Sequence, residues 1–248
     1  MNFRLLRLAL VGLLLLPASG QGETPLTVFA AASLRGALDE VVATYSAPVV
    51  VSYGGSGSMA RQIAQGAPAD LVILAHERWM TWLEDQDTIA PGSSRNLLGN
   101  TLVLIGRHGA APLPEPDAAG LLAALNGGRM AIGQRDSVPA GIYSRQWLEK
   151  IGAWTALQPH LAETDSVRAA LALVALGEAP LGVVYASDAL AEPQVAVLWT
   201  VPPDQHDPIT YPAAAITERG QPLLEHLFSG EARQIFADHG FVPVAATP

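Results

Sequence analysis

The chain has 248 residues, with 14 Lys plus Arg against 23 Asp plus Glu, no Cys and a formal net charge of −9. Nucleic-acid binding needs a basic face that this acidic balance does not supply, so nucleic acid is not an expected partner. The absence of cysteine excludes disulfides and thiolate metal sites.

The first 20 residues have the pattern of a secretory signal peptide. Arg4 and Arg7 precede the apolar run Leu8–Leu16, and small residues follow at 18–20. That run is shorter than the roughly 20 residues of a membrane span. We therefore expect residues 1–20 to be a signal peptide and the mature protein to be exported to a bacterial periplasm.

Strands and helices are predicted to alternate along the rest of the chain. Apolar β-branched runs predict strands, and apolar residues at helical spacing predict helices. The predicted strands are 26–30, 49–52, 70–75, 101–105, 129–133, 181–185, 195–200 and 210–215. The predicted helices are 34–45, 58–65, 77–85, 121–125, 141–151, 166–176 and, as terminal helices, 222–236. This alternation predicts an α/β fold in which ligands bind beyond the carboxyl ends of the strands.

The stretch Val49–Asp70 joins a strand to a helix through a turn rich in glycine and serine. Its glycines let the backbone come close to a ligand, and Ser56 and Ser58 are candidate helix caps. Ser33 is predicted to cap the helix after the first strand. A helix N-terminus has unpaired N–H groups and partial positive charge, which together can bind an anion. Taken alone, however, each of these is more often an ordinary capped turn.

Four longer motifs resemble the periplasmic molybdate-binding proteins of ABC importers. They are AAASL at 30–34, ARQIAQGAPADLVILA at 60–75, RMAIGQRDSVPAGIY at 129–143 and APLGVVYASD at 179–188. The resemblance implies a two-lobed, hinged type II periplasmic-binding-protein fold, with a mixed sheet flanked by helices in each lobe. It also implies that lobe I comprises residues 24–100 plus 213–248, and lobe II residues 101–212.

The same resemblance implies a receptor and not an enzyme. We expect a monomer without a cofactor that captures molybdate, and tungstate, in the cleft and delivers it to an inner-membrane ABC permease. Molybdenum would be present only within the bound oxyanion. The implied ligand groups are the hydroxyls of Ser33, Ser56 and Tyr185 and the backbone N–H groups of Ser33, Ala140 and Val167. The relatives often carry more hydroxyl residues near Ser56, so a contribution from Ser58 stays open.

The expected donor set favours a fully deprotonated tetrahedral dianion. Hydrogen phosphate carries a proton for which such a site has no acceptor. Molybdate, tungstate or sulfate would fit, and a binding protein for sulfate or another oxyanion is the main alternative. Three arginines near the turns are interpreted as helix-surface or inter-lobe residues, namely Arg61, Arg135 and Arg168.

A dinucleotide-dependent enzyme is a weaker alternative. Residues 55–60, GSGSMA, satisfy G-x-G-x-x-A after a strand, but Gly66 and Pro68 interrupt the following helix. A serine hydrolase would need G-x-S-x-G, and Ser58 occupies the place of the last glycine. The sequence has no HExxH motif for a metal.

Overall fold

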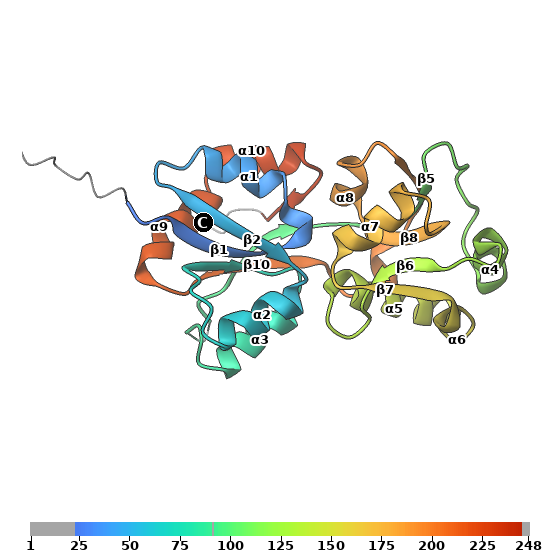
Figure 1. Cartoon of the computed structure of the whole chain (residues 1–248), viewed down its shortest axis with the longest axis horizontal. Coiled ribbons are helices and arrows are strands. Elements are labelled where there is room, and N and C mark those ends of the chain that lie inside the picture. The colour runs from blue at the N-terminus through green and yellow to red at the C-terminus, as the bar shows by residue number, and fades with distance from the viewer. Residues whose placement is uncertain (1–22, 91, 245–248) are drawn as a thin grey trace, which may run out of the picture.

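A computed structural model of the chain describes residues 23–90 and 92–244. The expected signal peptide lies outside the described residues. Two lobes lie side by side along the long axis of the molecule, each built on one β-sheet with helices packed on it (Figure 1). Over the described residues, every helix is too short or too polar to cross a membrane.

The first lobe contains a mixed six-stranded sheet in the order β11-β4-β10-β3-β1-β2. Strand β1 pairs in parallel with β2 and β3, whereas β10 runs antiparallel to β3 and β4. The strands are β1 (Leu26–Ala31), β2 (Val49–Gly54), β3 (Leu71–Ile73), β4 (Arg95–Gly99), β10 (Thr210–Ala215) and β11 (Val242–Pro243).

Helices cover both faces of this sheet. They are α1 (Ala37–Ala43), α2 (Ser56–Ala64), α3 (Glu77–Asp85), α9 (Gln221–Leu227) and α10 (Gly230–Asp238). Because side chains alternate along a strand, Phe29 and Val72 pack with Met59 and Leu83 of the α2–α3 side. Their neighbour Val28 packs in the other core, which includes residues of α1, α9 and α10. Burial of both faces explains why these strands read as continuous apolar runs.

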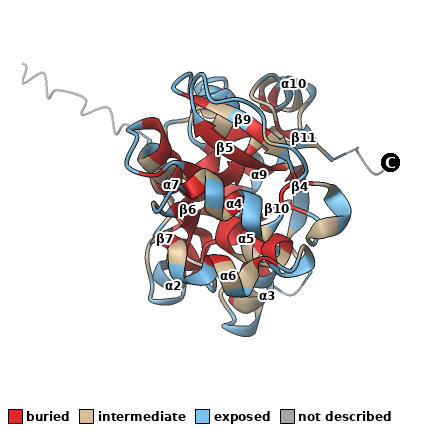
Figure 2. Ribbon diagram, turned by 90° about the vertical axis from the view of Figure 1, so that its right-hand side faces the viewer, coloured by how far each residue is buried: buried red, intermediate tan, exposed pale blue. Residues whose placement is uncertain are grey.

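The second lobe contains a mixed five-stranded sheet in the order β7-β6-β8-β5-β9. Its strands are β5 (Leu102–Arg107), β6 (Met130–Gly133), β7 (Leu161–Thr164), β8 (Leu181–Tyr185) and β9 (Val195–Thr200). Its helices are α4 (Ala118–Leu125), α5 (Pro139–Lys150), α6 (Trp154–Leu157), α7 (Val167–Ala175) and α8 (Ala186–Leu190). Figure 2 shows this lobe with its buried strands β5 and β6 behind more exposed helices.

The chain crosses between the sheets twice. The first crossing lies between Gly99, the end of β4, and Leu102, the start of β5. The second lies between Thr200, the end of β9, and Thr210, the start of β10, and includes the short 3-10 helix Pro203–Gln205. The predicted boundary at 212 falls inside β10, which pairs along its length with strands of the first lobe.

The predicted elements differ from the structure after β1 and at several short elements, since α6, α8 and β11 were not predicted. A continuous helix was predicted over 34–45, but a 3-10 turn, Ala32–Leu34, precedes α1, which begins only after Gly36 at φ +88°. That left-handed backbone ends the first turn before a regular helix can continue. Strands β4 and β7 were not predicted, because their sequences RNLLG and LAET lack a clear apolar pattern.

Candidate functional site

A small cavity of about 10 Å³ lies between the two lobes. Its lining consists of Ala31, Ala32, Ser33, Gly54, Gly55, Ser56 and Ala75 from the first lobe and Val138, Pro139, Ala140, Val167 and Tyr185 from the second. All five residues proposed as ligands from the sequence line this one cavity. Pockets for drug-sized ligands measure roughly 300–1,000 Å³, so this much smaller cavity suits a small ion rather than a dinucleotide.

The cavity lies where several strands end and helices begin. Strands β1, β2 and β8 end at or next to lining residues, as does β6, which leads through a short loop to α5. Helices α2, α5 and α7 each present their first turn to the cavity. The N–H groups of a first helical turn have no acceptor within the helix, and the helix dipole is positive at that end. The arrangement therefore favours an anion without any cationic side chain in the lining.

Ser33 is buried within the 3-10 turn after β1 and is not a helix cap. The N-cap of α1 is Gly36, and the Ser33 Oγ instead lies 2.9 Å from the hydroxyl oxygen of Tyr211 on β10. The predicted capping role was wrong because this buried partner competes for the hydroxyl. Ser33 nevertheless lines the cavity.

Ser56 is the first residue of α2, and the N-cap position belongs to Gly55. Its Oγ accepts a hydrogen bond of 3.0 Å from the backbone N–H of Ala75, which follows β3. The hydroxyl proton of Ser56 is therefore free to be donated to a ligand. Ser58 does not cap the helix either, since its Oγ accepts a hydrogen bond from Gln62 on the exposed side of α2.

The second lobe contributes backbone donors at two helix starts. Ala140 is the second residue of α5, after Pro139, and Val167 is the first residue of α7. Ser166 caps α7 by accepting a hydrogen bond from the N–H of Ala169, which leaves the N–H of Val167 without an acceptor within the helix. Both residues are buried and line the cavity.

Tyr185 ends β8 and is almost entirely buried. Its hydroxyl oxygen is inaccessible and has no hydrogen-bond partner among the described residues. Burial, followed by the nearby Tyr211, raises the pKa of Tyr185 well above its ordinary value, so the hydroxyl keeps its proton. Leaving a buried donor unpaired costs about 1–3 kcal/mol. A ligand in the adjoining cavity would supply the missing acceptor.

The charged residues near the cavity are engaged with one another. Arg168 forms an ion pair of 2.7 Å with Asp188, which is fully buried. Burial raises the pKa of Asp188 to about 6, and Arg168 opposes that rise. Arg135 pairs with Glu163 at the edge of the second lobe. The described residues contain no cluster of His, Asp and Glu that could hold a metal ion.

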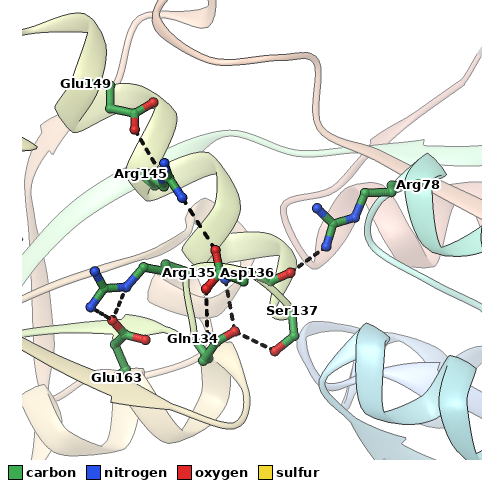
Figure 3. A network of polar contacts seen from close by, with 8 residues as sticks. All are labelled: Arg78, Gln134, Arg135, Asp136, Ser137, Arg145, Glu149 and Glu163. Atoms are coloured by element: carbon green, nitrogen blue, oxygen red, sulfur yellow. Dashed lines mark hydrogen bonds and ion pairs between the residues drawn. The ribbon is translucent and has the colours of Figure 1, made fainter.

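The lobes contact each other on both sides of the cavity. On one side, Trp79 Nε1 donates to the carbonyl of Ser137 at 3.0 Å. Arg78 likewise reaches across to the carbonyl of Asp136, in a loop braced by Gln134 (Figure 3). On the other side, Arg168 donates to the carbonyl of Arg35 at 3.3 Å. The structure is therefore a closed form.

Two glycines allow this close approach. A Cβ at Gly55 would lie 2.3 Å from the carbonyl oxygen of Asp165 in the other lobe. A Cβ at Gly57 would lie 2.5 Å from the Trp79 ring and 2.7 Å from the carbonyl oxygen of Ser137. The glycines of the first-lobe turn thus permit the lobes to meet, in addition to opening the backbone toward the cavity.

Two polar residues behind the lining were not predicted from the sequence. Tyr211 is fully buried on β10, and Asn100 lies in the first crossing between the lobes. Asn100 Nδ2 lies 3.3 Å from the Tyr211 hydroxyl. Neither residue belongs to a motif with a recognisable spacing. Only the pairing of β10 with β3 and β4 brings Tyr211 next to the end of β1.

Two lobes joined by two crossings, with helix N-termini around an interlobe cavity, define a solute-binding architecture. The family model for bacterial extracellular solute-binding proteins matches residues 26–242, and the chain belongs to this family. It is accordingly a solute-binding protein and not an enzyme.

The chain is also similar in sequence and in structure to individual solute-binding proteins. The molybdate-binding protein ModA of Escherichia coli K12 is 40% identical over 229 residues, covering 88% of this chain and 89% of its own length. The ModA protein of Haemophilus influenzae is 35% identical over 225 residues, covering 87% and 89%. The structure of the Azotobacter vinelandii periplasmic molybdate-binding protein matches with a TM-score of 0.74 at 26% identity, covering 90% of this chain and 100% of that one. The expected two-lobed α/β fold with mixed sheets is confirmed.

Proposed function

We propose that this chain binds molybdate, and also tungstate, in the interlobe cavity and delivers it to an inner-membrane ABC permease. The observation that carries the proposal is the buried Tyr185 hydroxyl, which has no protein partner and adjoins a cavity lined only by neutral groups. The names of the E. coli and H. influenzae relatives, both molybdate-binding proteins, support molybdate as the solute.

The proposed ligand groups are three hydroxyls and the backbone N–H groups beside them. They belong to Ser33, Ser56, Ala140, Val167 and Tyr185. Each hydrogen bond to a charged group contributes about 1.5–3 kcal/mol, so several together can offset the desolvation of a dianion. Molybdenum would enter the site only as the centre of the oxyanion, and the protein would need no cofactor.

A site made of hydrogen-bond donors favours an anion that is fully deprotonated at neutral pH. The Ser56 oxygen already accepts the Ala75 N–H and its proton is left to donate to a ligand, and a first-turn N–H can only donate. Hydrogen phosphate would have to place its proton against one of these donors. Sulfate is also a deprotonated tetrahedral dianion and would satisfy the same donors, so a binding protein for sulfate is the second candidate function.

Calorimetric titration tests the proposal directly. The mature chain is titrated at neutral pH with molybdate, tungstate, sulfate and hydrogen phosphate. We expect heat from the first two and no saturable binding of hydrogen phosphate. Sulfate binding as tight as molybdate would refute the assigned specificity, and the absence of binding by all four anions would refute the proposed function.

A single substitution tests the assigned ligand groups. Ser56→Ala removes a donor whose oxygen also accepts the Ala75 N–H, so molybdate affinity should fall by about 1–3 kcal/mol. Ser58→Ala is the matched control, since the Ser58 hydroxyl pairs with Gln62 on the exposed side of α2. Equal affinities for the Ser56→Ala variant and the unmodified chain would remove Ser56 from the site.

The cellular part of the proposal is export and delivery. We propose that residues 1–20 direct the chain to the periplasm and that it works there as a monomer. We further propose that residues 24–100 with 213–248 and residues 101–212 act as two hinged units closing around the ion, except that all of β10 (Thr210–Ala215) moves with the first unit, to whose sheet it is hydrogen-bonded. Expression of the full chain in bacteria that retain a molybdate permease but lack its binding protein should restore molybdate uptake. Lack of uptake despite periplasmic accumulation would count against delivery.

A further inference from the structure

A row of hydrogen-bonding side chains leads from the first crossing to the cavity. The Asn100 amide nitrogen lies 2.8 Å from the Ser187 Oγ and 3.3 Å from the Tyr211 hydroxyl oxygen. That hydroxyl oxygen lies 2.9 Å from Ser33 Oγ. The amide oxygen of Asn100 accepts a 2.9 Å hydrogen bond from the N–H of Thr101, which fixes the orientation of the amide. The nitrogen of Asn100 therefore faces Tyr211, and it can only donate.

The number of protons on each group then fixes the direction of the hydrogen bond between Tyr211 and Ser33. A phenol has one proton and can accept as well as donate. The Tyr211 oxygen accepts from Asn100, so its own proton is satisfied only if it is donated to Ser33. In the reverse arrangement Ser33 would donate to Tyr211, and the proton of the fully buried Tyr211 would have no acceptor. A buried unpaired donor is costly, so the arrangement from Asn100 to Tyr211 to Ser33 is favoured.

From this geometry we propose that Asn100 and Tyr211 are positioning residues that keep the Ser33 hydroxyl proton directed into the cavity. Ser33 then meets a bound oxyanion as a donor rather than as an oxygen lone pair. The inference rests on the oxyanion binding proposed above and adds residues outside the lining to the specificity of that site. It also places one of these determinants in the segment that joins the lobes.

A double-mutant cycle tests whether Tyr211 acts through Ser33. Tyr211→Phe keeps the ring, which contacts Phe241 and Tyr185 edge to face, and removes only the hydroxyl. We expect this variant to bind molybdate about tenfold more weakly in calorimetry. In a Ser33→Ala background the same change should have no further effect. Tyr45→Phe, whose ring packs on His226 of the first lobe, is the control and should leave affinity unchanged.

Reversing the polarity of Asn100 gives a sharper test. In Asn100→Asp the carboxylate would accept a hydrogen bond from the Tyr211 hydroxyl. The Tyr211 oxygen would then accept a hydrogen bond from Ser33, and the Ser33 proton would point away from the ion. Molybdate affinity should then fall further than in Tyr211→Phe. Adding Tyr211→Phe to Asn100→Asp should restore part of the molybdate affinity, because Ser33 then has no Tyr211 oxygen to donate to. The same Tyr211→Phe change in the unmodified chain should weaken binding. Charge repulsion by a carboxylate that stays ionised in both variants cannot produce this change of sign, and an unchanged pH dependence of binding between the two variants verifies that it stays ionised.

The outcomes separate this inference from the proposed function. An unmodified chain that does not bind molybdate would refute the proposed function, and this inference with it. If the unmodified chain binds but the effects of Tyr211→Phe and Ser33→Ala simply add, the inference alone is refuted. Circular dichroism and thermal melting verify folding of each variant. If Asn100→Asp does not fold, the cycle of Ser33 and Tyr211 still decides the question.

Discussion

Trp79 and Ser137 are joined across the two lobes by a hydrogen bond of 3.0 Å from the indole N–H to a backbone carbonyl. The indole belongs to α3 of the first lobe, and the carbonyl lies in the loop leading to α5, whose first turn lines the cavity. The same ring would contact a Cβ at Gly57, so it lies against the first-lobe turn as well. The environment of this indole therefore depends on whether the lobes are closed.

Trp79 should report closure by fluorescence. Opening the lobes exposes the indole N–H to water, so saturating molybdate should change the intrinsic emission of the unmodified chain. Trp79→Phe should abolish most of that change and weaken binding by a few fold, the value of about one hydrogen bond. Trp154→Phe, in the second lobe beside Arg135 and Arg145, should retain the signal. A full signal in Trp79→Phe would contradict this assignment.

Gly55→Ala should impair closure without unfolding either lobe. The backbone of Gly55, at φ −64° and ψ 135°, is open to alanine, but its Cβ would lie 2.3 Å from the Asp165 carbonyl oxygen of the other lobe. Overpacking of this kind costs about 1–3 kcal/mol, so molybdate affinity should fall by about tenfold or more. The thermal midpoint without ligand should change little. Gly230→Ala, at a site with no atom within 4 Å, is the control, and equal affinities for the two variants would show that the closed contact does not limit binding.

The five residues that the motifs single out line one cavity, and they could be found because strand ends and helix starts are local features. Ser33 and Ser56 each follow an apolar strand and Tyr185 ends one, and the sheets bring those strand ends to one cavity. The partners of the hydroxyls could not be predicted in this way. Ser33 and Tyr211 are 178 positions apart, and their contact depends on an antiparallel strand that returns from the other lobe.

The same limit explains the wrong capping predictions. A serine before a helical pattern is a good local candidate for a cap, but Ser33 and Ser56 both have tertiary partners. Ser166 had no such competitor and does cap α7. A serine that lines the cavity therefore differs from a helix cap by its contacts with residues far away in the sequence, and a local sequence pattern does not show such contacts.

Asp188 should make stability fall as pH rises through the mildly acidic range. Burial raises its pKa to about 6 in the folded protein despite Arg168, whereas an unfolded aspartate titrates near 4. The folded state therefore binds the Asp188 proton more tightly than the unfolded state does. The resulting stabilisation is present below about pH 4 and is lost between about pH 4 and pH 6. Two pKa units correspond to about 3 kcal/mol at most.

Urea unfolding across that pH range measures this effect. The difference in unfolding free energy between the unmodified chain and Asp188→Asn should shrink or reverse in favour of the variant as pH rises. The exposed Asp238→Asn is the control and should show no comparable trend. A difference for Asp188→Asn that is constant from pH 4 to pH 7 would mean that this carboxyl does not titrate as stated.

Tyr185→Phe should separate stability from binding. The hydroxyl is buried without a partner, so its removal should leave the unfolding free energy of the ligand-free protein unchanged or raise it by about 1 kcal/mol. Molybdate affinity should fall roughly 10- to 100-fold, because a hydrogen bond to a charged ligand is lost. Tyr53→Phe provides the opposite case. Its hydroxyl donates to Asp39 at 2.6 Å, so that variant should lose some stability and keep its affinity. If Tyr185→Phe lowered stability while binding molybdate normally, the hydroxyl would have a structural partner and no ligand role.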